Sequence, residues 1–250
     1  VSNTLSISTN SRIDVTGKGY LAGRTYPNTT TNASTSNGGG SYGGLGGNYS
    51  GTPNPLYGDY LNPNELGSGA GNGGSGGGLA RIVANVLILD GEIRADGGGG
   101  ASGGSGGGIY LDVGQLSGGG LVIAKGGNSV NGWSGGGGGR IAIYYDALSG
   151  FGLDRVSAPG GSGSSAGGAG TVYLKDTVAV QARLIYDNGG ITAPSATPLA
   201  GFTGAVLEVR SGANVSVTGA VAVADLRLTG SGSATFSNAV VATGSYMISG

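Results

Sequence analysis

The sequence of 250 residues contains no cysteine and no histidine, a single Met, a single Trp and only 10% charged residues. The lack of cysteine excludes a disulfide framework and a thiolate metal site. The lack of histidine excludes the commonest general base. We therefore expect no catalytic residue, no cofactor and no metal site, and we predict that the protein is not an enzyme.

Charge and hydropathy exclude two further classes of partner. Twelve basic and 13 acidic side chains give a net charge of −1, so no basic surface favours nucleic acid. No apolar run approaches the roughly 20 residues of a membrane-spanning helix, so no transmembrane segment is expected. The chain starts at Val1 without a signal peptide, and residues 245–250 have the alternation of a strand. We expect a processed subunit or part of a longer chain.

Glycine is abundant, with 60 residues arranged in tracts that lead directly into alternating strands. The clearest case is 135–145, Gly-Gly-Gly-Gly-Gly-Arg-Ile-Ala-Ile-Tyr-Tyr, and the same junction precedes Leu79 and Ile109. From Leu79 to Ile109, Ile141 and Val172 the steps are 30, 32 and 31 residues. Periods of that size are typical of solenoids and other repeat proteins.

The strand ends repeat as well. Residues 93–97, 122–126 and 156–160 each close a strand and open a glycine tract, and 13–17 matches them as a first, partial repeat. Turns are expected at the matching tripeptides 116–118 and 148–150. Alternation predicts strands at 5–7, 12–15, 82–89, 92–95, 109–113, 121–124, 141–145, 153–157, 171–174, 178–185, 205–209, 215–217, 221–223, 226–228, 234–236 and 240–242.

The tracts allow two interpretations. Glycine-rich chains often form flexible linkers. Glycine chains in the polyproline II conformation instead rise about 3.1 Å per residue, and without Cβ atoms they can approach closely and exchange main-chain hydrogen bonds. Residues 97–108 would then form two antiparallel legs of about 15–18 Å each. We favour the ordered form because strands fix both ends of every tract. Collagen is excluded because glycine does not recur at every third position.

The predicted fold is all-β, a parallel β-helix or solenoid with glycine-rich inserts of the polyglycine II kind. Residues 1–176 form the glycine-rich part, interrupted by a long insertion at 21–78 that contains a Tyr, Leu and Pro cluster. That cluster either packs across the glycine tracts as a lid or forms an exposed recognition loop. Residues 177–250 lack glycine tracts and continue as short strands in a β-helix-like manner.

Residues 57–175 carry a resemblance to a known class of proteins. The runs at 66–69, 135–140 and 169–175, where glycine leads into a strand, resemble glycine-rich repeat segments of very large bacterial surface and adhesin-like proteins. The tracts are more loosely similar to the polyglycine-helix bundles of a receptor-tyrosine-kinase glycine-rich domain and of phage tail-tip adhesins. The resemblance implies a solenoid scaffold at the cell surface and, for the looser relatives, ligand recognition.

Several side chains are candidates for contacts or modification. Sugar stacking or the capping of a glycine bundle would suit Trp133, and the insertion offers Tyr42, Tyr49, Tyr57 and Tyr60 as ligand contacts. Four Asn-x-Ser/Thr triplets mark possible glycosylation sites, at Asn28, Asn32, Asn48 and Asn214. The residues of the uncapped first and last strands that would pair with another chain are Leu5, Ile7, Ile13, Val15, Tyr246 and Ile248.

The sequence favours an extracellular or cell-surface structural protein, a subunit or repeat region of a filament, fibre or adhesin assembled by strand stacking. Its expected partners are copies of itself in a head-to-tail polymer, or the rest of a longer chain, and surface glycans. The alternative is a glycan- or receptor-binding adhesin tip, and a polysaccharide-active β-helix enzyme comes third. The carboxylates that such an enzyme would need are scattered beside turns, where Asp commonly satisfies backbone donors.

Overall fold

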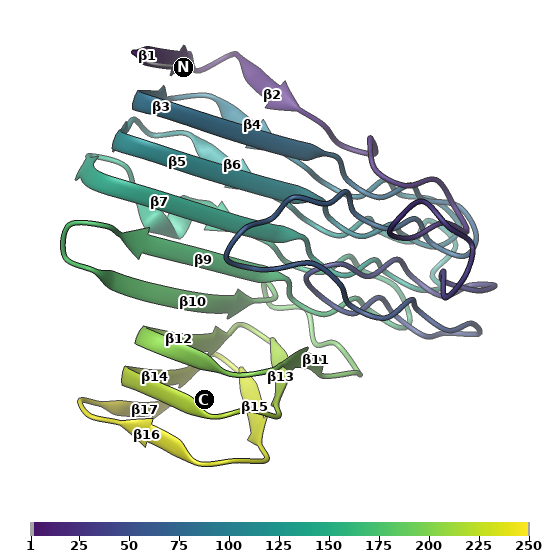
Figure 1. Ribbon diagram of the computed structural model, residues 1–250. Coiled ribbons are helices and arrows are strands. Elements are labelled where there is room, and N and C mark those ends of the chain that lie inside the picture. The colour runs from purple at the N-terminus through teal and green to yellow at the C-terminus, as the bar shows by residue number, and fades with distance from the viewer. Residues whose placement is uncertain (1–2, 250) are drawn as a thin grey trace.

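The computed structural model describes residues 3–249 and is all-β with mostly parallel sheets, which confirms the predicted class (Figure 1). A three-residue 3-10 helix, η1, spans Leu153–Arg155. The strands are β1 (Thr4–Ile7), β2 (Arg12–Asp14), β3 (Leu79–Leu89), β4 (Glu92–Arg94), β5 (Gly108–Ser117), β6 (Leu121–Ile123), β7 (Arg140–Ser149), β8 (Val156–Ser157), β9 (Thr171–Asp176), β10 (Gln181–Asp187), β11 (Thr197–Leu199), β12 (Phe202–Arg210), β13 (Asn214–Val217), β14 (Val221–Thr229), β15 (Ser233–Phe236), β16 (Val240–Ala242) and β17 (Tyr246–Ser249).

One ten-stranded sheet runs the length of the molecule in the order β1-β3-β5-β7-β9-β10-β12-β14-β16, with β17 also paired to β14. In its first half, equivalent residues of successive repeats stand opposite one another, as Ile109 does to Ile141 and Ile141 to Val172. Ile109 pairs with Ala80 and not with Leu79, so the first step is 29 residues instead of the predicted 30. This register places similar side chains of successive repeats next to one another in the sheet.

A smaller sheet, in the order β2-β4-β6-β8, covers one face of this first half. Ile93 stands opposite Ile13 and Val122, and Val122 opposite Val156, which confirms that 13–17, 93–97, 122–126 and 156–160 are equivalent strand ends. The core between the two sheets consists of fully buried aliphatic side chains from both, among them Leu87, Leu111 and Ile143 of the main sheet.

Several predicted strand limits were wrong, among them the break between 221–223 and 226–228, which form one strand, β14. Residues 116–118 do not form a turn outside the strand, because Leu116 is completely buried in the core and β5 continues to Ser117; β7 likewise runs to Ser149. Residues 153–155 form η1, which leaves only 156–157 as a strand. The strand predicted from Val178 begins at Gln181, because Asp176 accepts hydrogen bonds from the N–H groups of Val178 and Ala179 and closes a turn there.

The strand direction reverses once. Among the pairings of the named strands, β9–β10 is the antiparallel one, and β10, β12, β14, β16 and β17 then run parallel to one another. A three-stranded sheet, β11-β13-β15, covers this second half on the opposite face. Along β7, Ile141 and Ile143 belong to the first core and Ala142 to the second, which shows that the two cores lie on opposite faces.

The glycine tracts project from one end of the strands (Figure 1). Each consists of an outgoing leg (97–100, 126–128 or 160–162) and a return leg (102–107, 134–139 or 165–170). In the first return leg, the N–H groups of residues three apart point to the same neighbour. Gly103 and Gly106 donate to the next return leg, Gly104 and Gly107 to residues 98 and 95, and Ser102 and Ser105 to residues 72 and 68 of the insertion.

The insertion adds a further layer of legs to the tracts. Gly137 donates to the carbonyl of Gly40 (2.9 Å) and Gly168 to that of Leu45 (2.8 Å), while Gly47 donates back to Gly135 (2.8 Å). Residues 38–47 are therefore bonded to return legs of successive repeats. Within residues 3–249, no helix is long and apolar enough to cross a membrane.

Candidate functional site

Segments far apart in the sequence form a groove of about 430 Å³ on the outer face of the main sheet, the face opposite β2-β4-β6-β8. The insertion supplies one wall with residues 56–60, and the end of β11 with residues 198–200 and Thr218 supplies the other. Arg140, the first residue of β7, and Tyr186 of β10 complete the lining. Tyr186 is 1% exposed and Arg140 7%, so both lie at the base of the groove.

Arg140 is a buried cation held by the insertion. Its Nε and Nη2 donate to the carbonyl of Tyr57 at 3.1 and 2.9 Å, and its guanidinium carbon lies 5.3 Å from the centre of the Tyr42 ring. Within the part of the chain that the structure describes, it forms no ion pair. A desolvated charge without a counter-ion is costly, so this arrangement points to a functional site.

Tyr42 and Tyr57, two of the predicted contact residues, surround Arg140. The Tyr42 ring is fully buried, 4.9 Å from the Tyr57 ring, and its hydroxyl donates to Oε2 of Glu65 (3.0 Å). Burial raises the pKa of both tyrosines well above the ordinary value. Tyr42 thus offers no surface to a ligand, which corrects its expected role, while Tyr57 presents part of its side chain to the groove.

Tyr60, a further predicted contact, continues an aromatic ladder on the outer face of the sheet. Its ring lies 5.9 Å from Tyr173, which is 5.7 Å from Tyr144, and Tyr144 is 5.6 Å from Tyr110. Burial raises the pKa of Tyr144 to about 12. Arg81 ends the ladder, 4.0 Å from the Tyr110 ring centre. Tyr60, Tyr110 and Tyr144 are partly exposed, whereas Tyr173 is 7% exposed. A partly exposed aromatic ring can pack against the apolar face of a sugar.

The two remaining contact candidates lie elsewhere. Trp133 is partly buried at the turn of the second tract, where its N–H donates to Ser129 Oγ (2.7 Å). Tyr49, 54% exposed, is bonded through its N–H to Ser134 Oγ, beside Trp133. Six residues of extended leg, 134–139, lie between Trp133 and Arg140, a separation of about 20 Å. The predicted contact set is therefore divided between the tract tip and the groove.

The candidate glycosylation sites differ in surroundings. Asn28 and Asn32 are exposed on the insertion. Asn48 is exposed too, but its Oδ1 accepts a hydrogen bond from Ser165 Oγ at 2.8 Å. Asn214 lies in β13, paired with both β11 and β15 and partly buried. The first two triplets are the most accessible to a modifying enzyme.

The candidate assembly residues lie at the two ends of the main sheet and at the β2 edge of the four-stranded sheet. Within residues 3–249, β1 pairs with β3 alone and β2 with β4 alone, and Leu5, Ile13 and Val15 pack against the first core while remaining partly exposed. Ile7 is 5% exposed and belongs to that core. At the other end, Tyr246 and Ile248 of β17 are 57% and 78% exposed.

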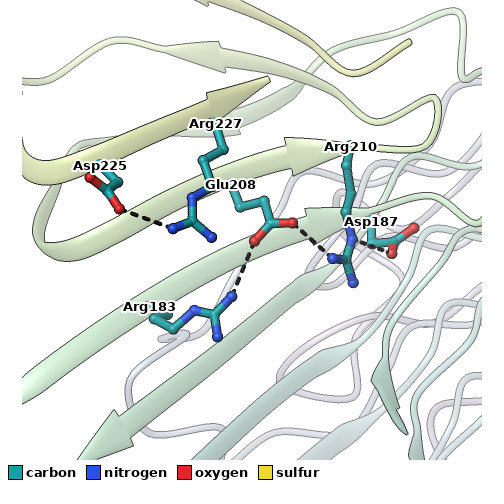
Figure 2. A network of polar contacts seen from close by, with 6 residues as sticks. All are labelled: Arg183, Asp187, Glu208, Arg210, Asp225 and Arg227. Carbon is teal, nitrogen blue, oxygen red and sulfur yellow. Dashed lines mark hydrogen bonds and ion pairs between the residues drawn. The ribbon is translucent and has the colours of Figure 1, made fainter. Parts of the chain in front are cut away.

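Charged side chains cover the face of β10, β12 and β14 that lies opposite the second core (Figure 2). Glu208, 6% exposed, accepts from Arg183 at 3.3 Å and from Arg210 at 2.8 Å, and Arg210 also bonds Asp187 at 2.6 Å. Burial alone would lower the pKa of Arg210, but the hydrogen bond to Asp187 and the charge of Glu208 outweigh it and raise the pKa. Three cations and three anions, including the Asp225–Arg227 pair, balance on this face.

Two carboxylates from neighbouring strands share a second groove. Asp112 of β5 and Asp146 of β7 line a hollow of about 420 Å³ together with residues 83–85 of β3. Both are exposed, and Asp146 accepts a hydrogen bond from the Thr177 hydroxyl. No group of three or more Asp or Glu side chains suited to a metal gathers among residues 3–249.

Sequence reasoning missed Arg140, Tyr186 and three of the ladder tyrosines, Tyr110, Tyr144 and Tyr173. A signal for Arg140 exists in the repeats themselves: at its position in the register, the other repeats carry Leu79, Gly108 and Thr171. A charged residue at a position where the other repeats carry small or apolar residues departs from the repeat, which indicates that it has a specific partner. Comparison of the chain with protein-family models, curated proteins and solved structures gives no match.

Proposed function

We propose that the chain is an extracellular structural protein, a β-solenoid braced by a polyglycine II bundle that serves as a subunit or repeat region of a cell-surface filament, fibre or adhesin. The observation that carries this proposal is the three-residue alternation of N–H direction in the return legs, which links each tract to those of the neighbouring repeats. Three residues per turn is the period of the polyproline II helix. Each rung is thus bonded to the next through main-chain groups in both the sheets and the tracts.

The ends of the main sheet support assembly by strand pairing. β1 and β17 expose main-chain donors and acceptors on one side, and an unpaired edge is a template for another chain. The two edges run in opposite directions, so a head-to-tail contact between them is antiparallel. The β9–β10 pair is an internal precedent for that contact, because it joins two parallel stacks in the same antiparallel way.

Ser6→Pro tests this contact. The carbonyl of Asn3 accepts from Val86 of β3 and that of Ile7 from Asp90, just after β3, so the backbone groups of residue 6 point to the open edge. Proline there removes an outward donor and leaves the pairing with β3 intact. We expect concentration-dependent association in sedimentation and fibrils in negative-stain images, weakened by Ser6→Pro and unchanged in the control Ser6→Thr. A wild-type chain that stays monomeric at high concentration would refute self-assembly and leave the rest of a longer chain as the partner.

A binding role is the second candidate, and the groove beside Arg140 favours it. A buried cation, partly exposed tyrosines and apolar walls converge in one hollow, the usual composition of a small-molecule site. Binding to a glycan array by the full chain tests this role. We do not propose a polysaccharide-active enzyme, and release of reducing ends from a polysaccharide, abolished by Asp112→Asn or Asp146→Asn, would contradict that choice.

A further inference from the structure

We propose that the groove beside Arg140 binds a carboxylate-bearing sugar, with the Arg140 guanidinium as counter-ion of the carboxylate. This ligand class specifies the binding role named second above, on which it rests, and is independent of the filament.

The charge of Arg140 favours an anionic ligand. Among the charged side chains of residues 3–249, the two that are buried are Arg140 (7% exposed) and Glu208 (6%). Glu208 is flanked by two arginines, whereas no carboxylate of residues 3–249 lies within ion-pair distance of Arg140. A buried charge is ordinarily paired or hydrogen-bonded on all sides. An anion in the groove would complete the surroundings of Arg140 as Arg183 and Arg210 complete those of Glu208.

The geometry of the Arg140 guanidinium favours a carboxylate. The guanidinium carries five N–H donors in a planar fork. The Tyr57 carbonyl takes the edge made by Nε and Nη2, and the Tyr42 ring lies over one face. The outer end of the fork, with Nη1, is not engaged by that carbonyl. Two parallel N–H groups at such an end match the two oxygens of a carboxylate.

The other lining residues of the groove suit a sugar ring. The groove has hydroxyl groups on Tyr60, Tyr186 and Thr218, and apolar surface on Leu56 and Pro198. Alternating hydroxyl and apolar surface suits a pyranose ring, which presents hydroxyls at its rim and C–H groups on its faces. The volume of the groove, about 430 Å³, lies toward the lower end of the range for ligand sites.

The charges that line the groove favour a carboxylate over a phosphate. Arg140 is the single Lys or Arg among the groove's lining residues, and a phosphate dianion usually takes several cations or backbone donors. Asp59, at the rim, is exposed and its Oδ1 accepts from the N–H of Leu61 (2.9 Å) within its own turn. A single acidic group at the rim disfavours a doubly charged ligand further.

The experiment measures binding of sodium glucuronate to the full chain by calorimetry and by NMR. Glucose, inorganic phosphate and a short acidic peptide are titrated in parallel. We expect saturable binding of glucuronate, and at least about tenfold weaker binding of the other three probes because they lack either the charge or the ring. The ligand class is wrong if glucuronate does not bind, if glucose binds equally well, or if phosphate or the peptide binds more tightly.

Variants locate the site. Arg140→Met and Arg140→Lys should each weaken glucuronate binding at least about tenfold, because lysine keeps the charge but lacks the fork. Arg81→Met is the matched control: Arg81 also bonds the insertion, at Asn62 and Pro63, and also lies over a tyrosine, yet it does not line the groove. If Arg140→Met does not fold, Arg140→Lys carries the test. Unchanged binding in a folded Arg140 variant, or equal loss in Arg81→Met, would overturn the assignment, whereas sedimentation reports separately on the filament.

Discussion

Gly136→Ala tests whether the glycine tracts are ordered supports. Gly136 lies in the middle of the second return leg, where a Cβ atom would stand 1.9 Å from the carbonyl oxygen of Gly104 and 2.9 Å from that of Gly103. Real Cβ atoms do not approach other atoms closer than 3.0 Å. The first two return legs would therefore have to separate by about 1 Å.

The magnitude follows from what that separation breaks. Gly103 donates to Ser134 and Gly106 to Gly137, both at 2.9 Å, on either side of Gly136. Lengthening each by about 1 Å takes them beyond hydrogen-bonding distance, at a cost of about 1 kcal/mol apiece. Overpacking adds about 1–3 kcal/mol. The expected loss in the free energy of unfolding is about 3–5 kcal/mol.

Gly119→Ala is the matched control. Nothing lies within 4 Å of a Cβ built at this exposed turn glycine, and its backbone does not adopt a positive φ. Alanine there should stabilise the fold by about 0.4–1 kcal/mol, because it restricts the unfolded chain. The two variants are thus expected to change stability in opposite directions.

Urea unfolding followed by circular dichroism measures both values, and amide exchange of residues 97–108 and 126–139 shows where the change occurs. In a flexible tether, alanine at either position would have a small effect, and the amides of the tracts would exchange freely. A loss below about 0.5 kcal/mol in Gly136→Ala would refute ordered packing of the legs.

Two further predictions concern charge and pH. Burial raises the pKa of Tyr42, Tyr57 and Tyr186, so the folded state holds their hydroxyl protons more tightly than the unfolded state does. The free energy of unfolding should therefore be unaffected by these tyrosines below pH 10 and fall as the pH rises above it. Their phenolate absorbance should appear only on unfolding. Glu208→Gln leaves Arg183 and Arg210 without their shared anion and should lower the free energy of unfolding by about 2 kcal/mol, discounted because both arginines are about one-third exposed. Asp225→Asn, at an exposed pair, should change it far less, and equal effects in thermal unfolding would contradict the role of burial.

The repeat was predictable because each unit of about 30 residues has the same local sequence pattern. Equivalent strand ends such as 93–97 and 122–126 are recognisable by inspection, and the register places Ile93 opposite Val122. The limits of the strands were less predictable. Leu116 continues β5 beyond the expected turn because its side chain completes the core, a tertiary effect that local turn residues do not reveal.

The groove was only half predictable. Tyr57 and Tyr60 were expected as contacts because aromatic residues clustered in an insertion usually have a packing or binding role. Their partners were not, since Tyr186 and Pro198 are more than 100 residues away in the sequence and are brought to them by the direction of β10. Tyr42 belongs to the same cluster but its ring is buried, because it lies beneath Tyr57 and against Arg140.

The reversal at β9–β10 explains where the groove lies. A crossover between parallel strands has a fixed hand, and reversing the strands alone would invert it. Moving the second layer to the opposite face at the same time restores the original hand, and β11-β13-β15 indeed lies opposite to β2-β4-β6-β8. The face that is outer in the first half, with Tyr144, therefore becomes the core face in the second half, while the former core face carries Glu208 and its arginines.

Where the new layer begins, at β11, its edge and the insertion face each other across a hollow that neither fills. In open α/β sheets, ligands bind where the strand order switches. The same geometric reason applies here: a change of covering layer leaves a crevice, and Arg140 stands at its base.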